Sequence, residues 1–193
     1  MRRPFVLMIP VFAILFVGCA PAVKTEKTDM PRARNRGSLT VVVKRSSEDV
    51  TAAEASRTKQ LLSEKFKLAG FSHVDMASTT DGATQSIELM ITKYEHASST
   101  QTGCAASAAG CIYICPLFAP CAFLPGYHDP QFEIMAEVSA HKNGRLAFKK
   151  VMSEKSVSKA NLVNVGNVEF KDKLEELTLH NFAVTLVSQW DKR

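Results

Sequence analysis

Apolar residues follow two different periods along the chain after residue 38. In five short segments they alternate with polar residues, which is the pattern of strands that bury one face and expose the other. In two longer segments they recur at helical spacing. The pattern predicts a first strand that begins at Leu39 and four further strands over 71–76, 86–94, 131–141 and 146–152. It predicts helices over 51–69 and 168–190.

Local motifs mark where several of these elements begin and end. Thr51 and Glu54 have the spacing of a capping box at a helix start. Gly70 lies where a helix end favours a positive φ. The dipeptide Asn143-Gly144 is typical of a type I′ turn, because both central residues of that turn need φ above zero. These motifs predict the bounds of the first helix and a tight hairpin between the last two strands.

The order of the elements is β-α-β-β-insert-β-β-α, which predicts an α+β fold, a two-layer sandwich. We expect a mostly antiparallel sheet of about five strands, with two helices on one face. The first two strands are joined through a helix, and we expect that crossover to be right-handed.

Alternation also assigns side chains to the two faces of the sheet. Ile87, Leu89 and Ile91 are expected on one face of the third strand, and the other face is expected to hold Glu88, Met90, Thr92 and Tyr94. The fourth strand has one fully apolar face, made of Phe132, Ile134, Ala136, Val138 and Ala140. The last helix has a broad apolar stripe for core packing, and Glu175 is assigned to its polar side.

An apolar insert, residues 102–129, separates the third and fourth strands. From Ala97 to Tyr127 the chain has no acidic residue, lysine, arginine or histidine. Hairpin connections normally have about two to five residues, and disordered segments are usually charged, so we expect a structured hairpin insert. The insert is cysteine-rich, with Cys104, Cys111, Cys115 and Cys121.

Two disulfides are the interpretation that best fits these four cysteines in an oxidising compartment, and three pairings stay open. A metal site is not predicted, because the spacing C-x6-C-x3-C-x5-C lacks the close pairs of zinc modules. Residues 104–124 have the length of a membrane span, but Pro116 and Pro120 interrupt them.

The large apolar side chains of the insert are candidates for contact with a partner or a membrane. They are Ile112, Tyr113, Leu117, Phe118, Phe123 and Leu124. The alternative is that the insert covers the sheet face that the helices leave bare, and patterning does not decide between cover and contact.

Residues 1–18 have the form of a secretory signal peptide: Arg2 and Arg3, then an apolar stretch, then the small residue Gly18. With Cys19 next, this leader resembles the lipobox of bacterial lipoproteins, although Phe16 stands where that family prefers Leu, Val or Ile. The resemblance implies that Cys19 is diacylated and becomes the new N-terminus, as a stable anchor. Because Ala20 is not Asp, it also implies the outer membrane, with the protein at the periplasmic face.

Residues 19–38 then form the lipidated cysteine and a flexible tether, because they lack apolar periodicity and contain two prolines. Arg32, Arg34 and Arg36 could contact anionic headgroups, but a solvated linker is the favoured interpretation. We assign 39–193 to one periplasmic α/β domain.

Composition and motifs narrow the function without naming it. The formal net charge is +5, two charges of which belong to the leader, so no nucleic-acid partner is predicted. No nucleotide-binding or catalytic motif is found, and we expect neither an enzyme nor a cofactor.

The order of elements is similar to small periplasmic α/β-sandwich lipoproteins of lipopolysaccharide assembly, curli secretion and penicillin-binding-protein activation. We therefore expect a non-catalytic binding or assembly factor with an envelope protein partner. The alternative is a carrier of a lipid or hydrophobic ligand with the insert as its lid. A membrane ring is disfavoured because the insert is apolar at both alternations. The oligomeric state stays open.

Overall fold

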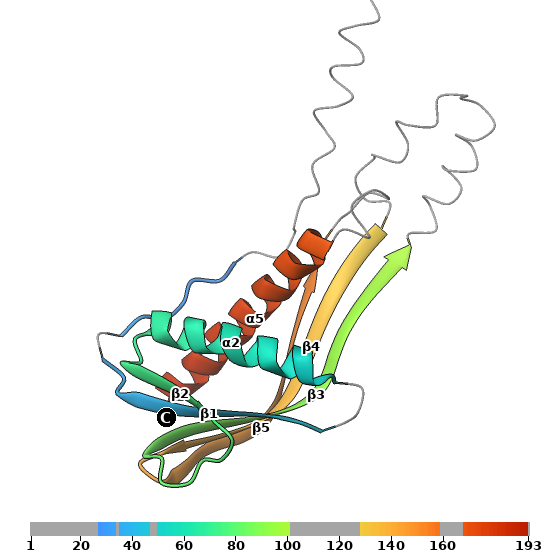
Figure 1. Ribbon diagram of the computed structural model, residues 1–193. Helices are drawn as coiled ribbons and strands as arrows, with labels where there is room; N and C mark the ends of the chain where they lie inside the picture. Colours follow the sequence, from blue (N-terminus) through green and yellow to red (C-terminus); the bar gives the residue numbers. More distant parts are fainter. Residues whose placement is uncertain (1–26, 34, 47–49, 101–127, 159–167, 193) are drawn as a thin grey trace, which may run out of the picture. The chain divides into compact units, whose positions relative to one another are not determined.

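The computed structural model describes residues 27–33, 35–46, 50–100, 128–158 and 168–192. These residues form five strands and two helices in the predicted order (Figure 1). The elements are β1 (Ser38–Arg45), α2 (Ala52–Ala69), β2 (His73–Ala77), β3 (Gln85–Thr100), β4 (His128–Lys142), β5 (Arg145–Val157) and α5 (Val168–Asp191). The third strand is longer than the sequence predicts, because it continues six residues past Tyr94.

The chain divides into two compact units. One consists of Glu26–His96, Phe132–Ser156 and Glu175–Arg193, and the other of Met1–Thr25, Ala97–Gln131 and Val157–Leu174. In the described part of the second unit, the Ser158 amide donates to the Pro130 carbonyl at 2.9 Å. The candidate site and the N-terminal segment described below belong to the first unit.

The sheet is mixed, with the strand order β2-β1-β3-β4-β5. Strand β1 lies between β2 and β3 and is parallel to both. Between β3 and β4, Thr92 contacts Met135 and Lys93 contacts Glu133, so the residue numbers run in opposite directions and the pair is antiparallel. The expected mostly antiparallel sheet is therefore half parallel, because β1 is inserted between two strands of its own direction.

The local motifs of the sequence are confirmed. The Thr51 hydroxyl accepts from the Glu54 amide at 3.2 Å, and the Glu54 carboxylate accepts from the Thr51 amide at 2.8 Å. Gly70 ends α2 with φ 103°. Asn143 and Gly144 have φ 53° and 72°, as a type I′ hairpin requires.

The core lies between the sheet and the two helices, which cover one face of the sheet (Figure 1). All five apolar residues predicted for the inner face of β4 are at most 1% exposed. From the helices, Leu62, Phe66, Leu179 and Phe182 are buried to the same degree. Each such side chain contributes about 1.5–3 kcal/mol by leaving water, so this layer supplies most of the stability of the unit.

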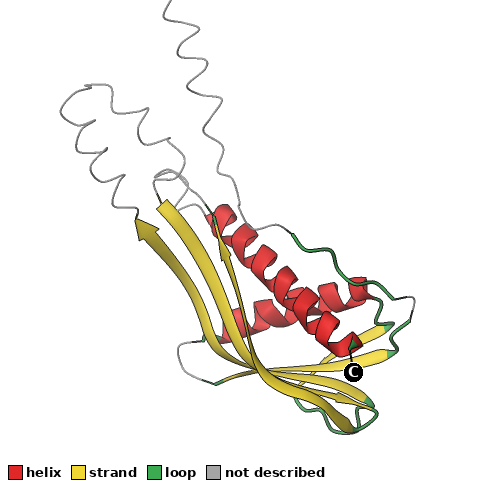
Figure 2. Ribbon diagram, turned by 180° about the vertical axis from the view of Figure 1, so that it is seen from behind, coloured by secondary structure: helices red, strands yellow, loops and turns green. Residues whose placement is uncertain are grey.

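Ion pairs line the opposite face of the sheet, which no described helix covers (Figure 2). Lys44 pairs with Glu88 at 2.6 Å, and Lys149 pairs with Glu137 at 2.9 Å. Both lysines are about half exposed, as expected for a solvated face. Val151 of β5 is 61% exposed.

Residues 27–33 and 35–37, called the strap below, run beside the helices before the chain enters β1 (Figure 1). The Thr28 amide donates to Asn181 Oδ1 at 3.1 Å, and the Ala33 amide donates to the Ala69 carbonyl at 3.2 Å. We predicted a flexible tether as far as residue 38. These bonds attach its described part to both helices, which the sequence does not reveal because the partners lie far away along the chain.

Candidate functional site at the bulge of β3

The site residues predicted from the sequence lie outside the described residues. This holds for Cys19, for Cys104, Cys111, Cys115 and Cys121, and for Ile112, Tyr113, Leu117, Phe118, Phe123 and Leu124. Their lipidation, pairing and contacts stay predictions. The described chain approaches the insert through β3, and the candidate site lies on that strand at residues 92–96.

The alternation of side chains along β3 shifts by one residue at Thr92 and Lys93. Ile91 is fully buried on the inner face, so Thr92 belongs to the outer face. Lys93 is also on the outer face, because it pairs with Glu133 of β4. Two consecutive residues on one face indicate a β-bulge, a feature that re-aims side chains and is over-represented next to active sites.

The bulge corrects one assignment made from the sequence. Strict alternation placed Tyr94 on the outer face with Thr92, but its ring packs against the buried Phe132, with centroids 4.8 Å apart and planes at 74°. His96 contacts the same ring, with centroids 4.5 Å apart. The segment beyond the bulge therefore turns its even-numbered residues inward and its odd-numbered residues outward.

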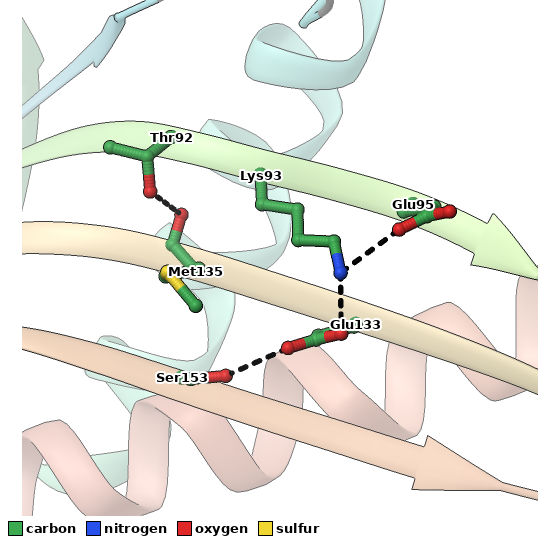
Figure 3. A network of polar contacts seen from close by, with 6 residues as sticks. All are labelled: Thr92, Lys93, Glu95, Glu133, Met135 and Ser153. Carbon is green, nitrogen blue, oxygen red and sulfur yellow. Dashed lines mark hydrogen bonds and ion pairs between the residues drawn. The ribbon is translucent and has the colours of Figure 1, made fainter.

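The outer side of this segment carries a polar network (Figure 3). Lys93 Nζ lies 2.8 Å from Glu133 Oε2 and 2.9 Å from Glu95 Oε2. Ser153 Oγ donates to Glu133 Oε1 at 3.3 Å. The hydrogen bond from Lys93 holds the pKa of Glu133 below its usual range, and the same bond raises the pKa of Lys93. Water screens such exposed pairs, so they contribute little to stability and mainly keep this face charged.

The inner side holds a carboxylate between two potential cations. Glu175 of α5 is only 5% exposed, and its Oε1 lies 2.7 Å from Arg57 Nε of α2. Its Oε2 lies 3.6 Å from His96 Nε2. The side chains of Arg57 and His96 are 43% and 31% exposed, so the cluster reaches the surface through these two residues.

Tyr94 completes this inner cluster. Burial raises the pKa of its phenol far above the usual value, and the nearby Glu175 carboxylate raises it further. The hydroxyl therefore stays protonated. Within the described part of the chain it makes no hydrogen bond of regular geometry. A neutral phenol beside a charge-balanced carboxylate offers a donor for recognition but no activated nucleophile.

Across the described ranges, no three His, Cys, Asp or Glu side chains converge as a metal site. Neither α2 nor α5 is long and apolar enough to traverse a bilayer.

Sequence reasoning missed the inner cluster, although one signal pointed to it. Glu175 was assigned to the polar side of the last helix, yet it precedes Leu179 by four residues and Phe182 by seven. That spacing places it on the buried stripe. Arg57 and His96 carry no comparable local signal, because the partner of each side chain lies more than 70 residues away along the chain.

A scan of protein-family models and a search of curated proteins found no match to this chain. Solved structures do match. Rare lipoprotein B from Shewanella oneidensis is 9% identical, with a TM-score of 0.41 over 79% of this chain and 96% of that one. A minor lipoprotein from Acinetobacter baumannii is 8% identical, with a TM-score of 0.39 over 82% and 92%.

Protein XCC0632 from Xanthomonas campestris is 9% identical, with a TM-score of 0.47 over 89% of this chain and 92% of that one. Two of these three proteins are lipoproteins by name. With TM-scores below 0.5, the matches support no argument about what this chain binds or does.

Proposed function

We propose that this protein is an outer-membrane lipoprotein whose folded domain is a non-catalytic binding or assembly factor of the cell envelope. The observation that carries the proposal is the leader, in which basic residues, an apolar stretch and Gly18 precede Cys19. Acyl chains on Cys19 would hold the domain at the periplasmic face. More than one chain is needed, because a single chain anchors only marginally.

The inner cluster supports a non-catalytic role. Arg57 lies at one oxygen of the Glu175 carboxylate and His96 at the other, and the Arg57 guanidinium pairs with the negative charge. The cluster contains no hydroxyl or thiol other than the Tyr94 phenol, whose raised pKa keeps it protonated. Nucleophilic chemistry needs a group that is poised to attack, and a protonated phenol is not such a group.

The outer face of the sheet favours partner contact over internal cover for the insert. Its ion pairs, such as Lys93 with Glu133, would lose water if apolar side chains lay on them. Burying charged groups under an apolar segment is costly. We therefore assign partner or membrane contact to the apolar side chains of the insert, with Tyr113, Phe118 and Phe123 as aromatic anchors.

The carrier alternative has no supporting observation in the described core. The space between the sheet and the helices is filled by side chains such as Phe66, Phe132 and Phe182, each at most 1% exposed. A hydrophobic ligand would need a cavity that these side chains occupy.

The anchor is tested by replacing Cys19. Cys19→Ser is expected to abolish the acyl mass on the N-terminal peptide and to move the protein out of the membrane fraction. Ala20→Ser is the matched control and should keep both. Ala20→Asp should retain the acyl mass but shift the protein to the inner membrane. An unacylated wild-type protein would overturn the proposal.

Partner binding is tested by in-cell photo-crosslinking from Phe118, with gels run without reductant. The control position is Leu68 on α2, which is 56% exposed and lies far from the insert in sequence. A discrete protein adduct from Phe118 alone supports the binding role and identifies the partner. Adducts with phospholipid alone support the carrier or membrane-contact alternative, and no adduct from Phe118 contradicts the contact assignment.

A further inference from the structure

The strap completes the hydrogen bonding of the end of α2. The last carbonyls of a helix have no partner within the helix. Here the Ala33 amide donates to the Ala69 carbonyl at 3.2 Å, and the Arg36 amide donates to the Gly70 carbonyl at 3.0 Å. A Cβ on Gly70 would lie 1.9 Å from the Ala33 carbonyl oxygen, so only glycine admits the strap this closely.

Arg36 fastens the C-terminal end of the strap to α5. Its Nε and Nη2 donate to the two carboxylate oxygens of Asp191, at 3.1 and 2.6 Å. Its guanidinium also lies over the Phe71 ring, 5.8 Å from the centroid, and its side chain is only 7% exposed. The last turn of α5 has no basic residue of its own, so Arg36 supplies the positive charge that a helix C-terminus favours.

A second attachment holds the other end of the strap near the middle of α5. The Thr28 amide donates to Asn181 Oδ1 at 3.1 Å, and the Thr28 carbonyl lies 2.7 Å from His180 Nε2, which donates to it. The strap is therefore held at both ends. This arrangement removes Arg36 from the set of arginines that the sequence offered for anionic headgroups.

We propose that the strap is a clamp that sets the distance between the lipid anchor and the folded domain, an inference that rests on the proposed acylation of Cys19. With the clamp closed, the chain from Cys19 to its first attachment at Thr28 spans at most about 30 Å, at about 3.3–3.6 Å per residue. With the clamp open, it runs to Ser38, a span of at most about 65 Å. The domain thus stays near the leaflet while Arg36 and Thr28 are bound.

The test uses the full lipidated protein in vesicles of phosphatidylethanolamine and phosphatidylglycerol. Hydrogen exchange at the Thr28 and Ala33 amides reports the clamp, and energy transfer from a dye at Val151 to labelled lipid reports the reach. Arg36→Ala should speed exchange at both amides about tenfold or more and lower the energy transfer, because charge-assisted bonds are lost. The exposed Arg32→Ala is the matched control and should change neither.

The charge swap Arg36→Asp with Asp191→Arg should restore slow exchange, which separates loss of the clamp from general unfolding. Exchange at unstructured-peptide rates in the wild type would overturn the clamp, even when mass spectrometry finds acylated Cys19. Unchanged energy transfer in Arg36→Ala, despite fast exchange, would overturn its role in reach. Mass spectrometry of the same sample also shows whether Cys19 is acylated. If it is not, there is no lipid anchor, and the strap cannot set a distance between the anchor and the domain.

Discussion

Glu175 shows how a single buried charge depends on partners from other elements. Its carboxylate lies in the layer between the sheet and the helices, 2.7 Å from Arg57 Nε. Removing one member of such a pair leaves the other without compensation in a poorly solvated place. The half-exposed Arg57 can reach water, whereas Glu175 cannot.

Arg57→Ala is therefore expected to lower the free energy of unfolding by about 2–3 kcal/mol, because Glu175 loses its closest cation. Urea unfolding at neutral pH measures this value. Lys173→Ala, which breaks the exposed pair with Glu169, is the control and should stay within about 0.5 kcal/mol. Adding Glu175→Gln to Arg57→Ala should recover part of the lost free energy of unfolding. Equal losses in Arg57→Ala and Lys173→Ala would contradict this expectation.

His180 contacts the strap, and the stability that it contributes depends on pH. Burial lowers its pKa below 6.5, and Lys27 and Lys65 lower it further, while the bond to the Thr28 carbonyl and the Glu176 carboxylate oppose this. The unfolded chain then binds more protons than the folded one. The stability contributed by neutral His180 is therefore complete above the unfolded pKa of 6.5 and is lost as pH falls through the folded pKa.

The wild type is expected to lose stability between about pH 7.5 and pH 5, and His180→Gln should lose less, because glutamine keeps a donor but does not titrate. Urea unfolding of both proteins at the two pH values measures the difference. The other histidines contribute equally to the pH dependence of stability in both proteins, so they do not affect the difference between them. An identical pH dependence in the two proteins is the result that would refute the assignment.

At the scale of the element, the bulge of β3 decides which side chains face the core. Ile91 and Tyr94 both point inward although they are three positions apart, so the strand holds one residue more than strict alternation allows. The extra residue turns Lys93 and Glu95 toward the outer network and His96 toward Glu175.

Deleting Thr92 is expected to cost only about 1 kcal/mol, because Ile91, Lys93 and Tyr94 then alternate regularly and keep their faces. Deleting Met90, in the regular part of the same strand, reverses the face of Leu89 or Ile91. It should cost about 3 kcal/mol or more through lost burial. Chemical unfolding of the two deletion variants measures both values, and similar losses would show that residues 92 and 93 do not form a bulge.

At the scale of the whole molecule, the leader and the cysteines of the insert both predict an oxidising compartment. The proposed signal peptide would deliver the chain to an oxidising space, where an even number of cysteines is expected to form disulfides. The four cysteines of the insert lie outside the described residues, so their pairing rests on the sequence alone.

Protein isolated from the periplasmic side is expected to take up no iodoacetamide at the four insert cysteines before reduction and four equivalents after it, because two disulfides protect them. Intact-mass spectrometry gives the count. Protein made in a reducing cytoplasm without residues 1–18 is the control and should be alkylated directly. Uptake at these positions before reduction would point to free thiols or a bound metal instead.

The sequence by itself determined what depends on neighbours along the chain. The inner face of β4, the capping box at Thr51, the positive φ of Gly70 and the hairpin at Asn143 all follow from residues within a few positions. Period, caps and turns are local, so a linear pattern is enough to predict them.

Only the tertiary structure decided the features whose partners are distant in sequence. Arg57 meets Glu175, Arg36 meets Asp191 and Thr28 meets Asn181 only after the sheet and the helices have packed. The same packing accommodates the one extra residue of β3 and gives β1 two parallel neighbours. Such contacts are set by which segments share a layer, and a linear pattern carries no information about an ion pair that closes across more than a hundred residues.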